Sequence, residues 1–320
     1  MAIFREIEPS NISLNNPIAR AEHDHIHRKL QHDQRSRWRS IALIAGLIGV
    51  VGLLITNRLA DMGFFRLLPD AVEVYAVLIA TVLMGFWHFG LMLRTLSMSA
   101  ETFVREKRGG TWESLVLTSA GARRLVLGKW WGVVSIVWKE YVLLAILRAF
   151  LIVVIGIVIT VRQSVALFPL DADPVSTALP GIVLAWIFSF AFMMINMGFT
   201  VAAGVMGSLF GRIHTPSIST GQSARLLVLV IPIVLLLLPV AVLIPLQNEQ
   251  ISYHGLLLLG GAQLSLIDNG MIFMAFLANP YDPHGLIYVV VALITLSVYG
   301  LMTILSLRVA ERIAIRQGAA

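Results

Sequence analysis

The chain has 320 residues, of which 58% are hydrophobic and only 13% are charged. A soluble domain is about half apolar and a quarter charged, so the apolar surplus predicts a protein embedded in lipid. The absence of cysteine excludes disulfides, thiolate metal sites and cysteine nucleophiles. The net charge of +6 resides in loops and tails, and no nucleic-acid-binding motif accompanies it.

Six stretches of the sequence have the roughly 20 mostly apolar residues that a helix needs to cross a bilayer. They are Ile41–Thr56 with its flanks, Ala71–Leu93, a part of Val133–Val161, Gly181–Gly211, Leu226–Leu246 and Leu286–Leu307. A seventh stretch, Gly255–Leu277, is interrupted by polar residues and glycines, and we interpret it as re-entrant or interfacial. The sequence therefore predicts an all-α, polytopic membrane protein with six transmembrane helices.

The basic residues predict the orientation of these helices, because Lys and Arg accumulate on the cytoplasmic side of membrane proteins. Nineteen of them lie in residues 1–40, 94–129, 212–225 and 308–320, against three in the segments expected on the other side. Both termini are therefore predicted to be cytoplasmic. Residues 1–40 form a polar arm with an amphipathic helix, residues 41–307 one membrane domain with an extracellular segment at 247–284, and residues 308–320 a tail.

The cytoplasmic loop 94–129 is the most informative segment, since it predicts a short helix of its own. Gly109-Gly110 interrupt the preceding helix. Thr111 suits an N-cap, and Glu113 falls in the first turn, where the helix dipole favours an anion.

Three apolar side chains give this short helix one apolar face. Trp112, Leu115 and Val116 follow one another at i, i+3 and i+4, and this spacing places them on the same side of a helix. Such a face either docks in a groove on a soluble partner or lies on lipid headgroups. The periodicity alone leaves both alternatives open.

The loop also contains a set of short motifs in a fixed order. They are Glu106-Lys107, Gly110-Thr111-Trp112-Glu113, Leu115, Thr118, Arg123-Arg124 and Gly128-Lys129, preceded in the N-terminal arm by Asn16–Glu22. This order resembles the signature of ABC-2 type transporter permeases. The resemblance implies that the short helix is a coupling helix, which contacts a separate ATP-binding subunit. The residues implied in this contact are Glu106, Gly110, Thr111, Trp112, Glu113, Leu115 and Val116.

The resemblance further implies a permease subunit of an ATP-binding cassette exporter, in the cytoplasmic (inner) membrane of a prokaryote. Its partners would be the ATP-binding subunit, a second permease subunit in a homodimer or heterodimer, and membrane lipid. The chain itself is expected to be no enzyme and to hold no cofactor, with ATP and Mg²⁺ on the partner. The sequence itself agrees that ATP is bound elsewhere, because Gly128-Lys129-Trp130 lacks the Ser or Thr of a phosphate-binding Walker A loop.

Two polar residues within the predicted spans are candidates for the translocation path. Arg148 lies in the third span, and a charge at that depth is costly and often functional. Asn196 lies in the fourth, where an amide needs a hydrogen-bonding partner. His23 and His27 share a helical face without the acidic residue of a zinc-binding motif, so we expect no metal site. No arrangement of residues predicts a catalytic site.

Two other functions fit the composition. An ion-coupled secondary transporter would show inverted repeats and acidic residues within its spans, and Glu140, at the edge of a span, is the nearest candidate. A membrane scaffold subunit that transports nothing would not need the motifs of the loop.

Overall fold

The computed structural model describes residues 16–32, 46, 70–118, 121–167, 174–210 and 285–318. These residues form helices and turns without a strand, so the all-α prediction is confirmed for them. The predicted first and fifth spans, the re-entrant stretch 255–277 and the extracellular segment 247–284 lie outside the described residues.

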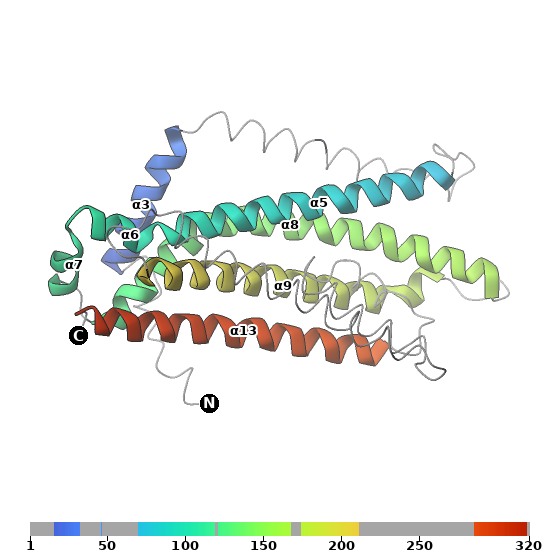
Figure 1. Ribbon diagram of the computed structural model, residues 1–320. Coiled ribbons are helices and arrows are strands. Elements are labelled where there is room, and N and C mark those ends of the chain that lie inside the picture. The colour runs from blue at the N-terminus through green and yellow to red at the C-terminus, as the bar shows by residue number, and fades with distance from the viewer. Residues whose placement is uncertain are drawn as a thin grey trace, which may run out of the picture.

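Four long helices form the body of the described structure (Figure 1): α5 (Asp70–Ala100), α8 (Ala122–Leu167), α9 (Pro174–Phe210) and α13 (Gly285–Arg316). Helix α9 packs against each of the other three. Helix α8 contains 46 residues, which is about 70 Å at 1.5 Å per residue. It is therefore more than twice as long as the hydrocarbon of a bilayer is thick, and longer than the span predicted from hydropathy.

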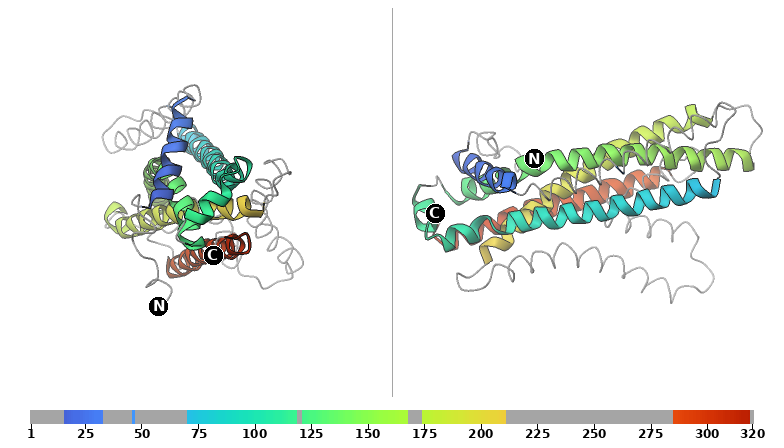
Figure 2. Two further views of the ribbon diagram at one scale, coloured as in Figure 1. Left: turned by 90° about the vertical axis from the view of Figure 1, so that its left-hand side faces the viewer. Right: turned by 90° about the horizontal axis from the view of Figure 1, so that it is seen from above.

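Three short helices gather at one end of this bundle: α3 (Pro17–His32), α6 (Thr102–Arg108) and α7 (Trp112–Thr118). Helices α5, α9 and α13 end here, and α8 begins here (Figure 1). Figure 2 shows α3 lying across the ends of the long helices. The N-terminal arm, the loop and the C-terminal tail, which the basic residues predict to share one side, thus meet at one end.

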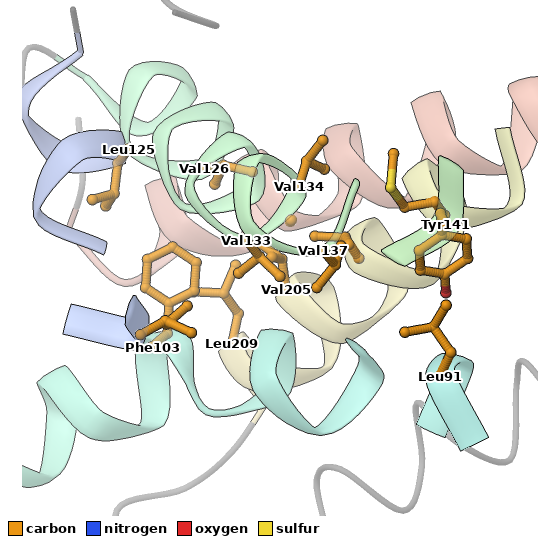
Figure 3. Packing of buried hydrophobic residues seen from close by; sticks show 14 of the residues in the cluster. Leu91, Phe103, Leu125, Val126, Val133, Val134, Val137, Tyr141, Val205 and Leu209 are labelled. Atoms are coloured by element: carbon orange, nitrogen blue, oxygen red, sulfur yellow. The ribbon is translucent and has the colours of Figure 1, made fainter. Parts of the chain in front are cut away.

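Two apolar clusters fill the space between the helices. The cluster nearer the loop is formed by α5, α6, α8 and α9, with contributions from α3 and α13, and we call it the loop-end cluster (Figure 3). Its buried members include Phe103, Leu125, Val133, Tyr141, Val205 and Leu209. Phe103 brings α6 into this core, so the loop is packed onto the bundle.

Large apolar side chains also cover the outside of the long helices. Exposed examples are Leu83, Phe89, Ile146, Phe150, Leu184, Ile187, Phe190, Leu293, Leu301 and Leu305. Several polar side chains point inwards instead, among them Thr95, Ser99, Thr200 and Ser208. Among the residues whose side chains are described, one helical stretch, Gly181–Phe210, is long and apolar enough to cross a membrane.

Candidate functional site

The turn between α6 and α7 depends on a glycine and on one side chain of α6. Gly110 has a φ of 68°, a left-handed conformation that a residue with a Cβ atom adopts only at a cost. Thr111 stands directly before α7, as the sequence predicts. Its hydroxyl donates to Glu106 Oε2 at 2.7 Å, and its backbone N–H donates to the Glu106 carbonyl at 3.1 Å.

Glu106 belongs to a cluster of two acids and two bases that joins three helices. Lys129 of α8 donates to Glu106 at 2.7 Å and to Glu22 of α3 at 2.6 Å. Arg105 of α6 donates to Glu22 at 2.7 Å and to Glu106 at 3.2 Å. The side chains of Glu22 and Lys129 are only 1% and 4% exposed. We call these four residues the charge cluster.

The charge cluster keeps Glu106 ionised. Burial by itself would raise the pKa of this carboxyl. The charge of Lys129, with hydrogen bonds from Lys129, Thr111 and Arg105, outweighs burial and lowers the pKa from 4.5 to about 2. Burial by itself would lower the pKa of the Arg105 guanidinium, because it too disfavours the charged form. The interactions with Glu22 and Glu106 outweigh burial and raise this pKa overall. Glu106 and Arg105 therefore both carry their charges near neutral pH.

Trp112 is held by three contacts with its own chain. Its ring meets the Phe103 ring edge-on, with 5.7 Å between centroids. The ammonium of Lys107 lies 5.6 Å from the indole centroid, within the range of a cation–π interaction. The indole N–H donates to the backbone carbonyl of Gln317 at 3.4 Å. The loop and the C-terminal tail are thus in direct contact.

The apolar face predicted for the short helix is turned toward the bundle. Leu115 and Val116, like Trp112, are partly buried against the loop-end cluster. The opposite face carries Glu113, which is exposed, and Leu117, which is 85% exposed. Docking of a partner on the inward face stays a prediction, and it requires α7 to give up contacts within its own chain.

The end of α9 is fixed by donors from two other segments. Lys107 of α6 and the side-chain amide of Gln317 each donate to the Leu209 carbonyl at 2.9 Å. Carbonyls in the last turn of a helix have no partner within the helix, so these donors satisfy a group that would otherwise need water. Residues 308–320 were expected to form a simple tail, but α13 continues through them to Arg316.

Helix α3 begins at a cap that also reaches α8. The side-chain oxygen of Asn16 accepts from the backbone N–H of Ile18 at 3.0 Å, and its amide donates to the Arg124 carbonyl at 3.2 Å. Pro17 follows as the first helical residue, where its missing N–H costs nothing. The amphipathic helix predicted in the arm is therefore present, and its beginning is attached to the loop.

The two candidates for the translocation path are both buried between α5, α8 and α9. The Asn196 amide lies 3.2 Å from His88 Nε2, so it bonds across helices as one of the two alternatives expected. Arg148 is fully buried and approaches the Met193 sulfur at 3.6 Å. Met193 and Asn196 lie one turn apart on α9, so both candidates meet the same face of that helix. Both are packed among protein atoms.

Sequence reasoning named Glu22 and Lys129 only as members of the motifs and assigned no contact to them, and it missed Arg105, Leu117 and Gln317. Glu22 carried a local signal, because it shares a helical face with the buried Ala19 and Ile26. The glycines at 128 and 132 have the spacing that lets a second helix approach closely. No local pattern marks Gln317, whose partner Trp112 is 205 residues away.

Comparisons of the chain with protein-family models, with curated proteins and with solved structures found no match. The described residues themselves define a helical bundle, apolar on the outside, with a loop anchored by buried charges at one end.

Proposed function

We propose that the chain is the permease subunit of an ATP-binding cassette exporter, which couples to a separate ATP-binding subunit through α6 and α7. One observation carries the proposal. The loop is tied to α8 by the charge cluster, yet it presents the exposed Leu117 at the end of the bundle. An apolar side chain displayed on the outward face of an anchored helix is suited to a protein partner.

The outer surface of the bundle supports a place in the membrane. Large apolar side chains cover the outside of α5, α8, α9 and α13, and contiguous apolar surface of this kind marks contact with lipid or another protein. We assign six transmembrane helices to the whole chain, two of which lie outside the described residues. The basic end, with α3, the loop and the tail, is assigned to the cytoplasm of a prokaryotic cell.

In this proposal the ATP-binding subunit contacts the outward face of α7, with Leu117 at its centre and Glu113 beside it. Displacement of α7 passes to α6 through Thr111 and Glu106, and from Glu106 to Lys129 of α8. It passes to α13 through the contact between Trp112 and Gln317. One docked helix thus acts on several long helices at once.

We place the translocation path at the contact of two permease subunits. Arg148 and Asn196 remain candidate path residues, and because both are buried within one subunit, they reach the contact between subunits only after α5, α8 and α9 rearrange. The ATP-driven opening of the bundle supplies such a movement.

The ion-coupled alternative is less well supported. Its candidate acid, Glu140, accepts from Arg94 of α5 at 2.7 Å and 2.8 Å and is 42% exposed. An acid already paired and partly open to its surroundings is suited to fixing two helices rather than to carrying ions. A scaffold subunit that transports nothing would not need the ordered motifs of the loop.

Purification of the chain with its partners tests the proposal. We expect a co-purifying polypeptide that an azido-ATP photoprobe labels, while the chain itself stays unlabelled. Proteoliposomes that contain both should hydrolyse ATP and transport, and those with the chain alone should do neither. Transport by the chain alone, driven by an ion gradient, contradicts the proposal and favours the secondary transporter.

A further inference from the structure

We infer that α3 is a working part of the coupling loop, and that Glu22 is a positioning residue that holds α6 and α8 together. The contacts of α3 alone support the role of Glu22 in positioning α6 and α8. The consequence of this role for transport rests on the function proposed above. The N-terminal helix thereby acts on the loop, and the membrane surface is not what holds it.

The first support is the shape of the contact between α3 and α8. A Cβ atom at position 132 would lie 2.7 Å from the Cβ of Glu22 and 3.0 Å from the Ala19 carbonyl. A Cβ atom at position 128 would lie 2.8 Å from the Asn16 amide nitrogen. Only glycine at these two positions of α8 lets α3 approach this closely, so the contact is specific.

The second support is the charge balance at this contact. Glu22 accepts from both bases of the charge cluster, Lys129 and Arg105. Arg105 is 35% exposed and can turn to water, but Lys129 is 4% exposed and cannot. Without the Glu22 carboxylate, two bases would share the single acid Glu106. The pull that holds α6 beside α8 then weakens, because Arg105 loses its shorter ion pair.

The third support is the composition of the outer face of α3. Its exposed residues are Pro17, Arg20, Ala21, Asp24, His25, His27 and Arg28, whereas Ala19 and Ile26 are buried against the chain. A helix that lies in a membrane surface inserts an apolar face into the lipid. In the described part of α3, the apolar face is buried against the bundle.

These contacts make α3, α6 and the beginning of α8 one body. A movement of α7 that reaches Glu106 is passed to Lys129 and from there to Glu22. In the absence of Glu22, α6 keeps its link to α8 through Glu106 alone. We therefore expect the loop to become more mobile while the long helices stay assembled.

The absence of cysteine from the chain allows a direct test with single thiols. Ile26→Cys places a thiol on the face of α3 that is 5% exposed. In the purified protein a maleimide should modify it slowly. Addition of Glu22→Gln should make the modification at least tenfold faster, and Gly132→Val should do the same without a change of charge. Asp24→Asn, an exposed acid on the same helix, is the matched control and should change nothing.

A second measurement separates positioning from mere attachment of α3. Spin labels at Ser114 and Arg312, both exposed, report the distance between the loop and α13. Glu22→Gln should broaden this distance distribution, and Glu22→Asp, which keeps the charge, should narrow it again. An unchanged maleimide rate or an unchanged distance distribution in Glu22→Gln overturns the inference.

A third experiment measures coupling, and it uses the complex of the chain with its ATP-binding subunit. We expect Glu22→Gln to retain the bound subunit but to lose most of the transport per ATP hydrolysed. Full coupling, together with a released α3, overturns the role of Glu22 in coupling. If no ATP-binding subunit exists, the proposed function fails, and the thiol and spin-label measurements still decide the positioning.

Discussion

Glu22 and Lys129, 107 residues apart in the sequence, form an ion pair at 2.6 Å in which both side chains are almost completely buried. Arg94 and Glu140 form a pair of nearly the same length, 2.7 Å, but their side chains are 35% and 42% exposed. When one partner is lost, water can solvate the other in the exposed pair, whereas Lys129 stays buried with Glu106 as its remaining acid. The two pairs therefore serve the chain differently although their geometry is alike.

This difference predicts two unequal effects on stability. Glu22→Gln should lower the free energy of unfolding by somewhat less than the roughly 3–5 kcal/mol that a buried charge without any partner costs, because Lys129 keeps its ion pair with Glu106. Glu140→Gln should cost about 1 kcal/mol or less, because water screens this pair. Unfolding in mixed micelles with increasing denaturing detergent measures both. Equal losses for the two variants would show that burial does not distinguish the pairs.

The carboxyl of Glu106 predicts a dependence of the loop on pH. Its pKa is about 2 in the folded chain against 4.5 for a free side chain, so its contribution to stability is complete above pH 4.5. As the pH falls from 4.5 toward 2, protonation removes this contribution. The thermal stability of the wild type should decrease across this window.

The variant Glu106→Gln isolates this carboxyl from the other acids of the chain. It should be less stable than the wild type near neutral pH, and the difference between the two proteins should shrink as the pH falls below 4.5. A constant difference from pH 6 to pH 2 contradicts the assigned role of Glu106.

Gly204 marks the close approach of α9 to α5. A Cβ atom at this position would lie 1.8 Å from the Ser99 hydroxyl and 2.7 Å from the Ser99 Cβ. Gly204→Ala should therefore cost about 1–3 kcal/mol, the usual penalty for overpacking. Ser99→Gly should recover most of this loss. Gly198→Ala is the control on the same helix, because its nearest neighbour would lie at 3.7 Å.

The sequence predicted the local features of the site and missed those that depend on distant segments. The break at Gly109-Gly110 and the common face of Trp112, Leu115 and Val116 follow from backbone preferences and helical period, so the sequence contains them. This face packs against a surface that includes Phe103 and Gln317. The helical period of α7 gives no information about those two residues, because they lie in other segments of the chain. For that reason a face expected to await a partner is packed against its own chain.

The same limit applies to the N-terminal arm. Asn16 and Pro17 are recognisable as the beginning of a helix, and α3 was predicted. Its packing against Gly128 and Gly132 was not predicted. A glycine at a helix contact cannot be distinguished in the sequence from any other glycine of an apolar helix until the partner helix is known. Glu22 shares a helical face with Ala19 and Ile26, which distinguishes it from Asp24, but nothing in the sequence identifies Lys129 as its partner.

The shared end of the bundle predicts the accessibility of single thiols. The asymmetry of basic residues assigns the loop end to the cytoplasm, so Ser114→Cys should react with an impermeant maleimide in inverted vesicles and not in intact cells. Gly285→Cys, at the opposite end of α13, should show the reverse pattern. Modification of Ser114→Cys in intact cells would rule out the proposed orientation.

The last prediction separates docking from positioning on the two faces of α7. Leu117 is 85% exposed, so Leu117→Asp should leave the fold intact and weaken only the contact with the ATP-binding subunit. Loss of a central apolar anchor costs about 2 kcal/mol or more, roughly a thirtyfold loss of affinity. Ser114→Ala, on the same exposed face, should have little effect. Recovery of the ATP-binding subunit in a pull-down with the tagged chain measures these changes.

Trp112→Ala should act by another route, because Trp112 contacts Phe103, Lys107 and Gln317 of its own chain. The variant should loosen the end of α13, and a thiol at Ala314, which is fully buried, reports this as faster modification. Leu117→Asp should leave that thiol protected. If Leu117→Asp instead retains the partner, while Trp112→Ala loses it without exposing Ala314→Cys, then the inward face is the docking face. In that case α7 must leave its seat on the loop-end cluster to bind, and coupling begins with that release.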